Sequence, residues 1–143
     1  MGAPVKVLIV EDVKLLRTML EHQLRELGVD LVVTAADGTE ALSVLTRELD
    51  VDLIISDWHM EPMDGLDFCA RIQALPHIRG RGIPVVFMTS DERLADPAKR
   101  HRALETARAI GIVDMLMKPV STEELRDAMV RCSRFAAAAL AAG

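Results

Sequence analysis

The chain has 143 residues, of which half are apolar, so it is long enough for one domain with a layered core and too short for two comfortable domains. Its 22 acidic and 17 basic residues give a formal charge of −5, which argues against a nucleic-acid-binding surface. The apolar runs are short, so we expect neither a membrane span nor a signal peptide, and we expect a cytoplasmic protein.

Five short apolar runs predict five β-strands, because each run is bounded by glycine, proline or aspartate. Several of them are apolar on both faces, as strands buried in a parallel sheet are. In chain order the predicted strands are residues 5–10, 30–34, 52–56, 83–88 and 112–117.

Five helical segments follow these strands, each with leucine, alanine or other apolar residues at helical spacing. Helices begin and end at recognisable residues, since caps satisfy the main-chain groups that the first and last turns leave unpaired. The signals are Gly28 after the first helix, Asp37-x-x-Glu40 at the start of the second, Asp96-Pro97 at the start of the fourth and the capping box Ser121-x-x-Glu124 at the start of the fifth.

This alternation of strand and helix predicts a doubly wound α/β domain, with a parallel sheet that is covered on both faces. In such sheets the functional crevice lies beyond the carboxyl ends of the strands. The second predicted strand ends in Ala35-Ala36-Asp37, which carries no obvious chemistry. The other four end in Glu11-Asp12, Asp57, Thr89-Ser90-Asp91 and Lys118-Pro119, in chain order. Ser90 and Asp91 either shape access to the site or simply begin the loop that follows.

The carboxylates at these strand ends indicate a cation site. Glu11, Asp12 and Asp57 would converge at one edge of the sheet, where like charges resist full ionisation unless a cation lies among them. Oxygen ligands without cysteine or histidine at ligand spacing favour Mg²⁺ or Mn²⁺ over zinc. A carboxylate beside such a metal can accept a phosphoryl group, and Lys118 and Thr89 would meet the charge of that group, so the residues suit phosphoryl transfer.

The chain resembles the receiver domains of two-component response regulators, in particular the single-domain receivers of chemotaxis. The resemblance covers about residues 5–135 and rests on Glu11-Asp12, the segment SDWHMEPMDG at 56–65, Thr89 and Lys118-Pro119. It implies a flavodoxin-like (β/α)5 fold with strand order 2-1-3-4-5. It also implies a single receiver domain over residues 1–143, with an alanine-rich tail at 136–143.

The resemblance implies a role for each of these residues. Asp57 is expected to accept the phosphoryl group, with Lys118 and Thr89 assisting the reaction. The bond between Lys118 and Pro119 is expected to be cis, which proline makes accessible. The expected ligands of Mg²⁺, or alternatively of Mn²⁺, are Glu11, Asp12, Asp57 and the backbone carbonyl of His59.

The implied function is a phosphorylation-dependent switch. A sensor histidine kinase or a histidine phosphotransfer protein would donate the phosphoryl group. A downstream protein would bind the face formed by the fourth helix, the fifth strand and the fifth helix, without direct contact to nucleic acid or membrane. The chain would catalyse only its own phosphorylation and dephosphorylation.

Two departures from the family pattern affect this switch. Met115 occupies the position at which many receivers carry an aromatic switch residue, so switching would involve Thr89 and the flexible side chain of Met115. The segment between Thr89 and Lys118 is also longer than usual, so the fourth helix should begin late, behind an extended loop.

Several other interpretations stay open. The side chain of His59 could serve as a general base or a phosphate relay. A metal-dependent phosphohydrolase with an aspartyl-phosphate intermediate is a second function, although the haloacid dehalogenase type carries an aspartate where this chain has His59. A phosphorylation-independent interaction module would not need the intact acids. A nucleotide-binding domain would need a glycine-rich loop where EDVKLLR stands.

Overall fold

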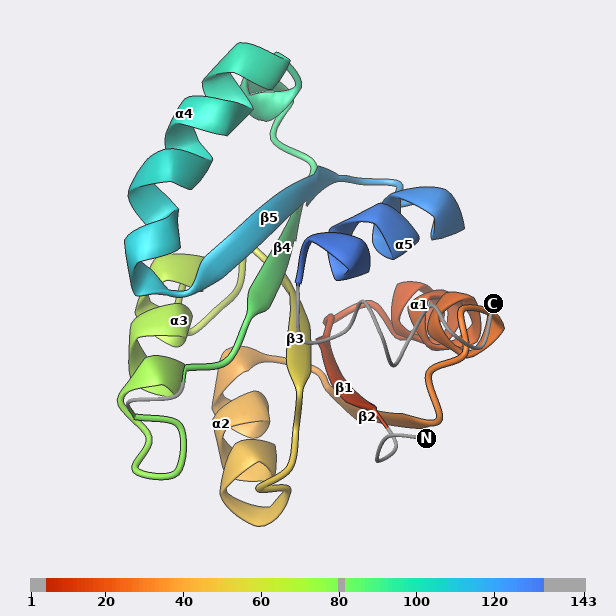
Figure 1. Ribbon diagram of the computed structural model, residues 1–143, viewed down its shortest axis with the longest axis vertical. Coiled ribbons are helices and arrows are strands. Elements are labelled where there is room, and N and C mark those ends of the chain that lie inside the picture. The colour runs from red at the N-terminus through yellow and green to blue at the C-terminus, as the bar shows by residue number, and fades with distance from the viewer. Residues whose placement is uncertain (1–4, 80–81, 133–143) are drawn as a thin grey trace.

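The computed structural model describes residues 5–79 and 82–132 and contains a sheet of five parallel strands (Figure 1). The strand order is β2-β1-β3-β4-β5, which confirms the predicted order. Each strand overlaps its predicted run, and no end differs by more than two residues. The strands are β1 (Lys6–Val10), β2 (Leu31–Ala35), β3 (Leu53–Asp57), β4 (Val85–Thr89) and β5 (Ile112–Met117).

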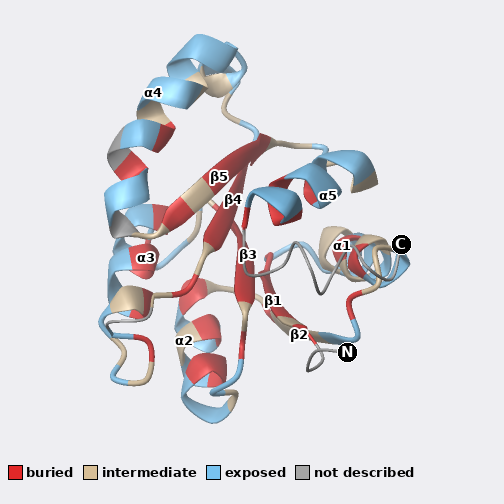
Figure 2. Ribbon diagram, in the orientation of Figure 1, coloured by how far each residue is buried: buried red, intermediate tan, exposed pale blue. Residues whose placement is uncertain are grey.

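Helices cover both faces of this sheet (Figure 1). The first face is covered by α1 (Lys14–Glu26) and α5 (Thr122–Arg131), and the second by α2 (Gly38–Arg47), α3 (Gly65–Gln73) and α4 (Pro97–Ala107). Alternate residues of β1 contribute to two separate cores, because Ile9 packs with the α1–α5 layer and Leu8 with the other layer. Figure 2 shows the buried strands between these two layers of helices.

Side-chain caps confirm the predicted helix starts. Asp37 caps α2 and Asp96 caps α4, and each accepts a hydrogen bond from a main-chain N–H group in the first turn. Ser121 and Glu124 form the predicted capping box of α5. These caps fix where each helix starts relative to the strand before it, and the strand ends form the candidate site.

The connection between β4 and α4 is extended, as expected. A short 3-10 turn, η1 (Glu92–Leu94), follows β4, and α4 begins only at Pro97. A second 3-10 turn, η2 (Arg108–Ile110), leads from α4 to β5. The extra length therefore lies at the carboxyl end of β4, beside Thr89.

The predicted end of the core at residue 135 and the predicted tail at residues 136–143 lie outside the described residues. The domain boundaries over 1–143 therefore stay a prediction. Among residues 5–79 and 82–132, none of the helices is both long enough and apolar enough to cross a membrane.

Candidate functional site

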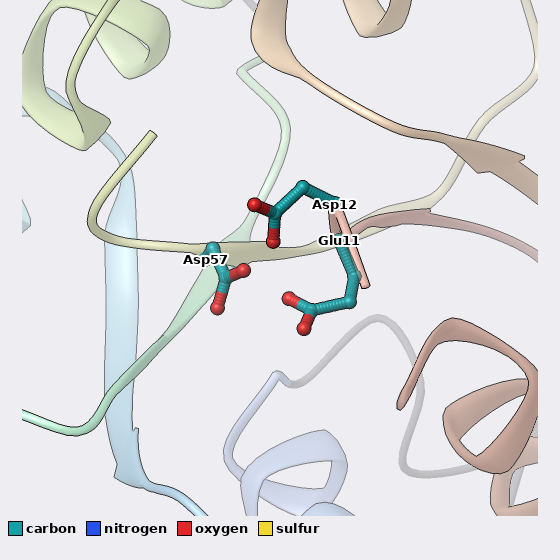
Figure 3. A group of neighbouring side chains, drawn as sticks. All are labelled: Glu11, Asp12 and Asp57. Carbon is teal, nitrogen blue, oxygen red and sulfur yellow. The ribbon is translucent and has the colours of Figure 1, made fainter. Parts of the chain in front are cut away.

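Three carboxylates meet at the carboxyl ends of the neighbouring strands β1 and β3. Asp57 is the last residue of β3, and Glu11 directly follows β1. Because β1 and β3 pair in parallel, with Val10 opposite Ser56, the two acids emerge side by side. Carboxylate oxygens of Glu11, Asp12 and Asp57 lie within 4.8 Å of one another (Figure 3). Glu11 and Asp57 are buried and Asp12 is exposed, so this group opens to solvent on the side of Asp12.

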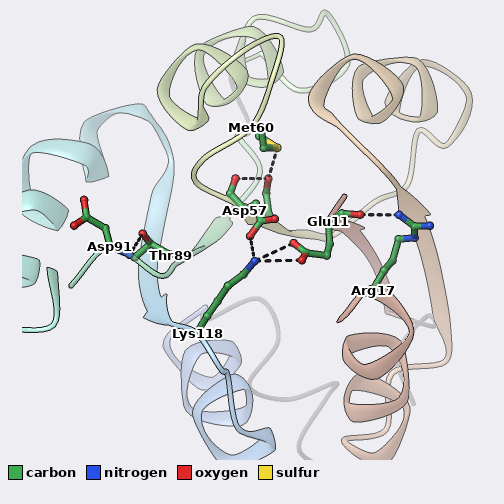
Figure 4. A network of polar contacts seen from close by, with 8 residues as sticks. Glu11, Arg17, Asp57, Met60, Thr89, Asp91 and Lys118 are labelled. Atoms are coloured by element: carbon green, nitrogen blue, oxygen red, sulfur yellow. Dashed lines mark hydrogen bonds and ion pairs between the residues drawn. The ribbon is translucent and has the colours of Figure 1, made fainter. Parts of the chain in front are cut away.

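Lys118 brings a cation to this group from the end of β5. Its Nζ lies 2.5 Å from Asp57 Oδ1 and 3.2 Å from each carboxylate oxygen of Glu11 (Figure 4). Its main-chain N–H donates to the carbonyl oxygen of Thr89 at 2.8 Å, which continues the pairing of β4 with β5. The bond between Lys118 and Pro119 is cis, and so is the bond between Glu61 and Pro62.

Burial and crowding shift the protonation of this cluster. Burial, followed by the neighbouring carboxylate of Asp57, raises the pKa of Glu11 from 4.5 to about 8, although Lys118 acts in the opposite direction. Burial acts to lower the pKa of Lys118, but Asp57 and Glu11 together outweigh it and raise that pKa. The single positive charge of Lys118 therefore does not balance the negative charge of three carboxylates. The carboxylate oxygens are hard ligand atoms that face one opening to solvent, and this arrangement suits a divalent cation such as Mg²⁺.

Thr89 lies buried at the end of β4, next to the cluster. Its Oγ1 accepts a hydrogen bond from the N–H of Asp91 at 3.0 Å (Figure 4). Met115 is opposite Phe87 in the pairing of β4 with β5 and is also buried. Of the two expected switch residues, Thr89 is therefore held through its hydroxyl group by the loop that follows it, and Met115 already lies inside the core.

The loop after Asp57 is fixed by the ring of Trp58. The main-chain N–H of Trp58 donates to the carbonyl oxygen of Met88 at 2.8 Å, and the Trp58 ring packs edge-on against Phe87 with 5.0 Å between the ring centroids. Gly65 lies so close that a Cβ atom there would be 2.7 Å from the Trp58 ring. This packing holds the main chain of the loop, including His59, at the mouth of the site.

His59 itself is exposed and lines a cavity of about 480 Å³. Asp12, Asp37 and Asp64 line the same cavity, so its rim is acidic. Asp37 follows β2, the strand whose end has no obvious chemistry in the sequence. Its carboxylate caps α2, and its presence at the rim follows from the position of β2 beside β1.

Sequence reasoning missed two contacts that organise the site. The Arg17 guanidinium of α1 donates from Nη1 to the carbonyl oxygen of Glu11 at 2.7 Å and so holds the start of the acidic pair (Figure 4). The Ser56 hydroxyl group lies 3.0 Å from the carbonyl oxygen of Asp57 and 3.4 Å from the sulfur of Met60. A six-residue separation gives no periodic signal for the Arg17 contact, whereas Ser56 and Met60 both lie in the segment that carries the resemblance.

Comparison with known proteins identifies the family. The family model described as the response regulator receiver domain matches residues 7–130. The chain belongs to this family. Chemotaxis protein CheY-3 of Vibrio cholerae is 32% identical to this receiver over 122 residues, which cover 85% of this chain and 86% of CheY-3.

Solved structures give the same result for the fold. CheY4 of Vibrio cholerae is similar with a TM-score of 0.73 and 31% identity, covering 90% of this receiver and 98% of CheY4. The receiver domain of the sensor histidine kinase PA1611 from Pseudomonas aeruginosa is similar with a TM-score of 0.69 and 30% identity, covering 90% and 97% of the two chains. The PA1611 structure has a magnesium ion coordinated in its active-site cleft.

Proposed function

We propose that this receiver accepts a phosphoryl group on Asp57, in a Mg²⁺-dependent reaction, from a sensor histidine kinase or a histidine phosphotransfer protein. The observation that carries the proposal is the position of Asp57. It ends the central strand of the sheet, lies within 4.8 Å of two further carboxylates and contacts Lys118 at 2.5 Å. A single buried aspartate placed between a cation and a proposed metal site is suited to act as a nucleophile.

The chemistry follows from the charges in the site. A carboxylate oxygen of Asp57 forms a bond to phosphorus while the bond from phosphorus to the donor's imidazole nitrogen breaks. That nitrogen keeps the electron pair, and with its second nitrogen protonated the imidazole leaves as a neutral molecule. Lys118 remains beside the new acyl phosphate and balances part of its charge.

The proposed metal ligands are the three carboxylates and the backbone carbonyl of His59, with Mn²⁺ as an alternative to Mg²⁺. When bound, the ion supplies positive charge that balances these carboxylates and the incoming phosphoryl oxygens. The raised pKa of Glu11 supports this assignment, since a cation would let that carboxyl group ionise.

The output follows from the added charge. Phosphorylation adds about two negative charges at Asp57, which attract the Thr89 hydroxyl group and Lys118. Thr89 ends β4, so its movement would alter the β4–α4 connection and the surface of α4, β5 and α5, where we place the downstream protein partner. Met115 would adjust within the core beneath that surface.

Three further parts of the proposal follow from similarity to the chemotaxis receivers. The whole chain forms one receiver domain, and its catalysis is confined to its own phosphorylation and dephosphorylation. It acts in the cytoplasm through protein partners, without direct contact to nucleic acid or membrane.

Phosphorylation by a small donor tests the central step. The protein is incubated with Mg²⁺ and acetyl phosphate, and intact mass spectrometry is expected to find one added phosphoryl group that hydroxylamine removes. Asp57→Asn should prevent the addition. An unmodified wild type, or an equally modified Asp57→Asn variant, would refute the proposal, and rapid multiple turnover of phosphate esters would instead favour the phosphohydrolase.

A further inference from the structure

One arginine holds both carboxylate oxygens of Asp91, in the connection between β4 and η1. Arg93 Nε lies 3.0 Å from Oδ1 and 3.2 Å from Oδ2, and Arg93 Nη2 lies 2.7 Å from Oδ2. The Arg93 main-chain N–H also donates to Oδ1, at 3.0 Å. The Asp91 side chain is only 16% exposed, whereas that of Arg93 is 86% exposed. An exposed arginine therefore neutralises a largely covered acid.

The main chain of Asp91 adjoins Thr89, at the sheet edge that carries Asp57. The N–H of Asp91 donates to Thr89 Oγ1, and Figure 4 shows Asp91 next to Thr89 at the same strand edge as Asp57. Hydrogen bonds from the Arg93 side chain are the main cause that lowers the pKa of Asp91 to about 2, and the charge of His59 contributes. Asp91 thus lies within electrostatic reach of the loop that follows Asp57.

We propose that Arg93 is a positioning residue for phosphoryl transfer, because it holds and neutralises Asp91 next to Thr89, at the sheet edge that must admit a phosphoryl anion. The inference rests on the proposed function of Asp57. Without Arg93, Asp91 would add an uncompensated negative charge near three carboxylates that only Lys118 and the proposed metal ion would balance. That charge would repel an anionic phosphoryl donor and attract a cation. Loss of Arg93 should therefore lower the rate of phosphorylation and raise the affinity for Mg²⁺.

The experiment compares Arg93→Ala, Arg93→Lys and the double variant Asp91→Asn/Arg93→Ala in the full chain. At saturating Mg²⁺, Arg93→Ala should lower the initial rate of phosphorylation by acetyl phosphate about three-fold at 0.15 M ionic strength, and by more at low ionic strength, where screening is weaker. The double variant should recover the wild-type rate, and Arg93→Lys should fall between wild type and Arg93→Ala. Arg79→Ala removes the same charge from the loop before β4, at the opposite sheet edge, and serves as the matched control.

A Mg²⁺ titration followed by Trp58 fluorescence supplies a second readout that needs no phosphorylation. Arg93→Ala should bind Mg²⁺ about two-fold more tightly, and the double variant should return to the wild-type affinity. A merely structural role for Arg93 would weaken both reactions together.

Three results would overturn the proposal for Arg93. They are an unchanged rate for Arg93→Ala at both ionic strengths, a double variant as slow as Arg93→Ala, and weaker Mg²⁺ binding in Arg93→Ala. If the wild type takes up no phosphoryl group, the proposed function of Asp57 fails. The Mg²⁺ affinities then still decide whether Arg93 neutralises Asp91.

Discussion

The buried carboxyl group of Glu11 makes the stability of the metal-free protein depend on pH. Burial and the neighbouring Asp57 raise the pKa of Glu11 to about 8, against 4.5 as its ordinary value. Between pH 4.5 and about pH 8, Glu11 keeps its proton in the folded state and releases it in the unfolded state, so the free energy of unfolding falls as pH rises. One proton changes it by at most about 1.4 kcal/mol per pH unit. We therefore expect a loss of about 2 kcal/mol between pH 6 and pH 8, which levels off above pH 8.

Urea unfolding in the presence of EDTA, followed by circular dichroism at several pH values, measures this dependence. The glutamine side chain in Glu11→Gln has nearly the same shape but does not titrate. The free energy of unfolding of this variant should therefore not show the decrease between pH 6 and pH 8. Added Mg²⁺ should stabilise the wild type more at pH 8 than at pH 6, because binding requires the ionised carboxylate. A wild-type stability that stays constant or rises from pH 6 to pH 8, or an equal fall in Glu11→Gln, would refute the reasoning.

Three further substitutions test the site and its packing. Asp12→Ala should raise the dissociation constant for Mg²⁺ at least about ten-fold, measured by quenching of Trp58 fluorescence, and an unchanged titration would contradict the ligand assignment. Lys118→Ala removes the cation that contacts Asp57, so the rate of phosphorylation should fall about a hundred-fold in the intact-mass assay; a near-normal rate would exclude the assigned role. Gly65→Ala places a Cβ atom 2.7 Å from the Trp58 ring, and urea unfolding should show a loss of about 1–3 kcal/mol, whereas no loss would mean that the contact relaxes freely.

The layers of the fold could be predicted because apolar strand runs alternate with helical segments, and the functional edge could be predicted because every strand except β2 leads into a chemically active residue. The strand β3, for example, is buried throughout and ends at Asp57. Its apolar residues predict the strand, and the aspartate after them indicates the functional end. Glu11, Asp57 and Lys118 could be identified for the same reason, since all three lie at carboxyl ends of strands that pair in one sheet. Helix starts were predictable because caps such as Ser121 act locally.

The contacts that depend on long side chains could not be predicted in the same way. Arg17 reaches back from α1 to the carbonyl of Glu11, and Arg93 in the 3-10 turn η1 folds back onto Asp91, the residue that caps this turn. Such contacts depend on the path of the loop and on rotamers rather than on a repeat in the sequence. The position of Asp37 at the acidic rim depends on β2 lying beside β1, an order that the family resemblance implies but that the residues around Asp37 do not show by themselves.

The most direct test of the account is to locate the phosphoryl group chemically. Borohydride reduces an acyl phosphate to an alcohol, so a phosphorylated aspartate becomes homoserine, which peptide mass spectrometry can assign to a position. After treatment with acetyl phosphate and Mg²⁺, we expect homoserine at position 57, and no reduced side chain at position 11 (hydroxynorvaline, from glutamate) or at position 12 (homoserine). A phosphoryl group on His59, or reduction at any carboxylate other than Asp57, would contradict the account.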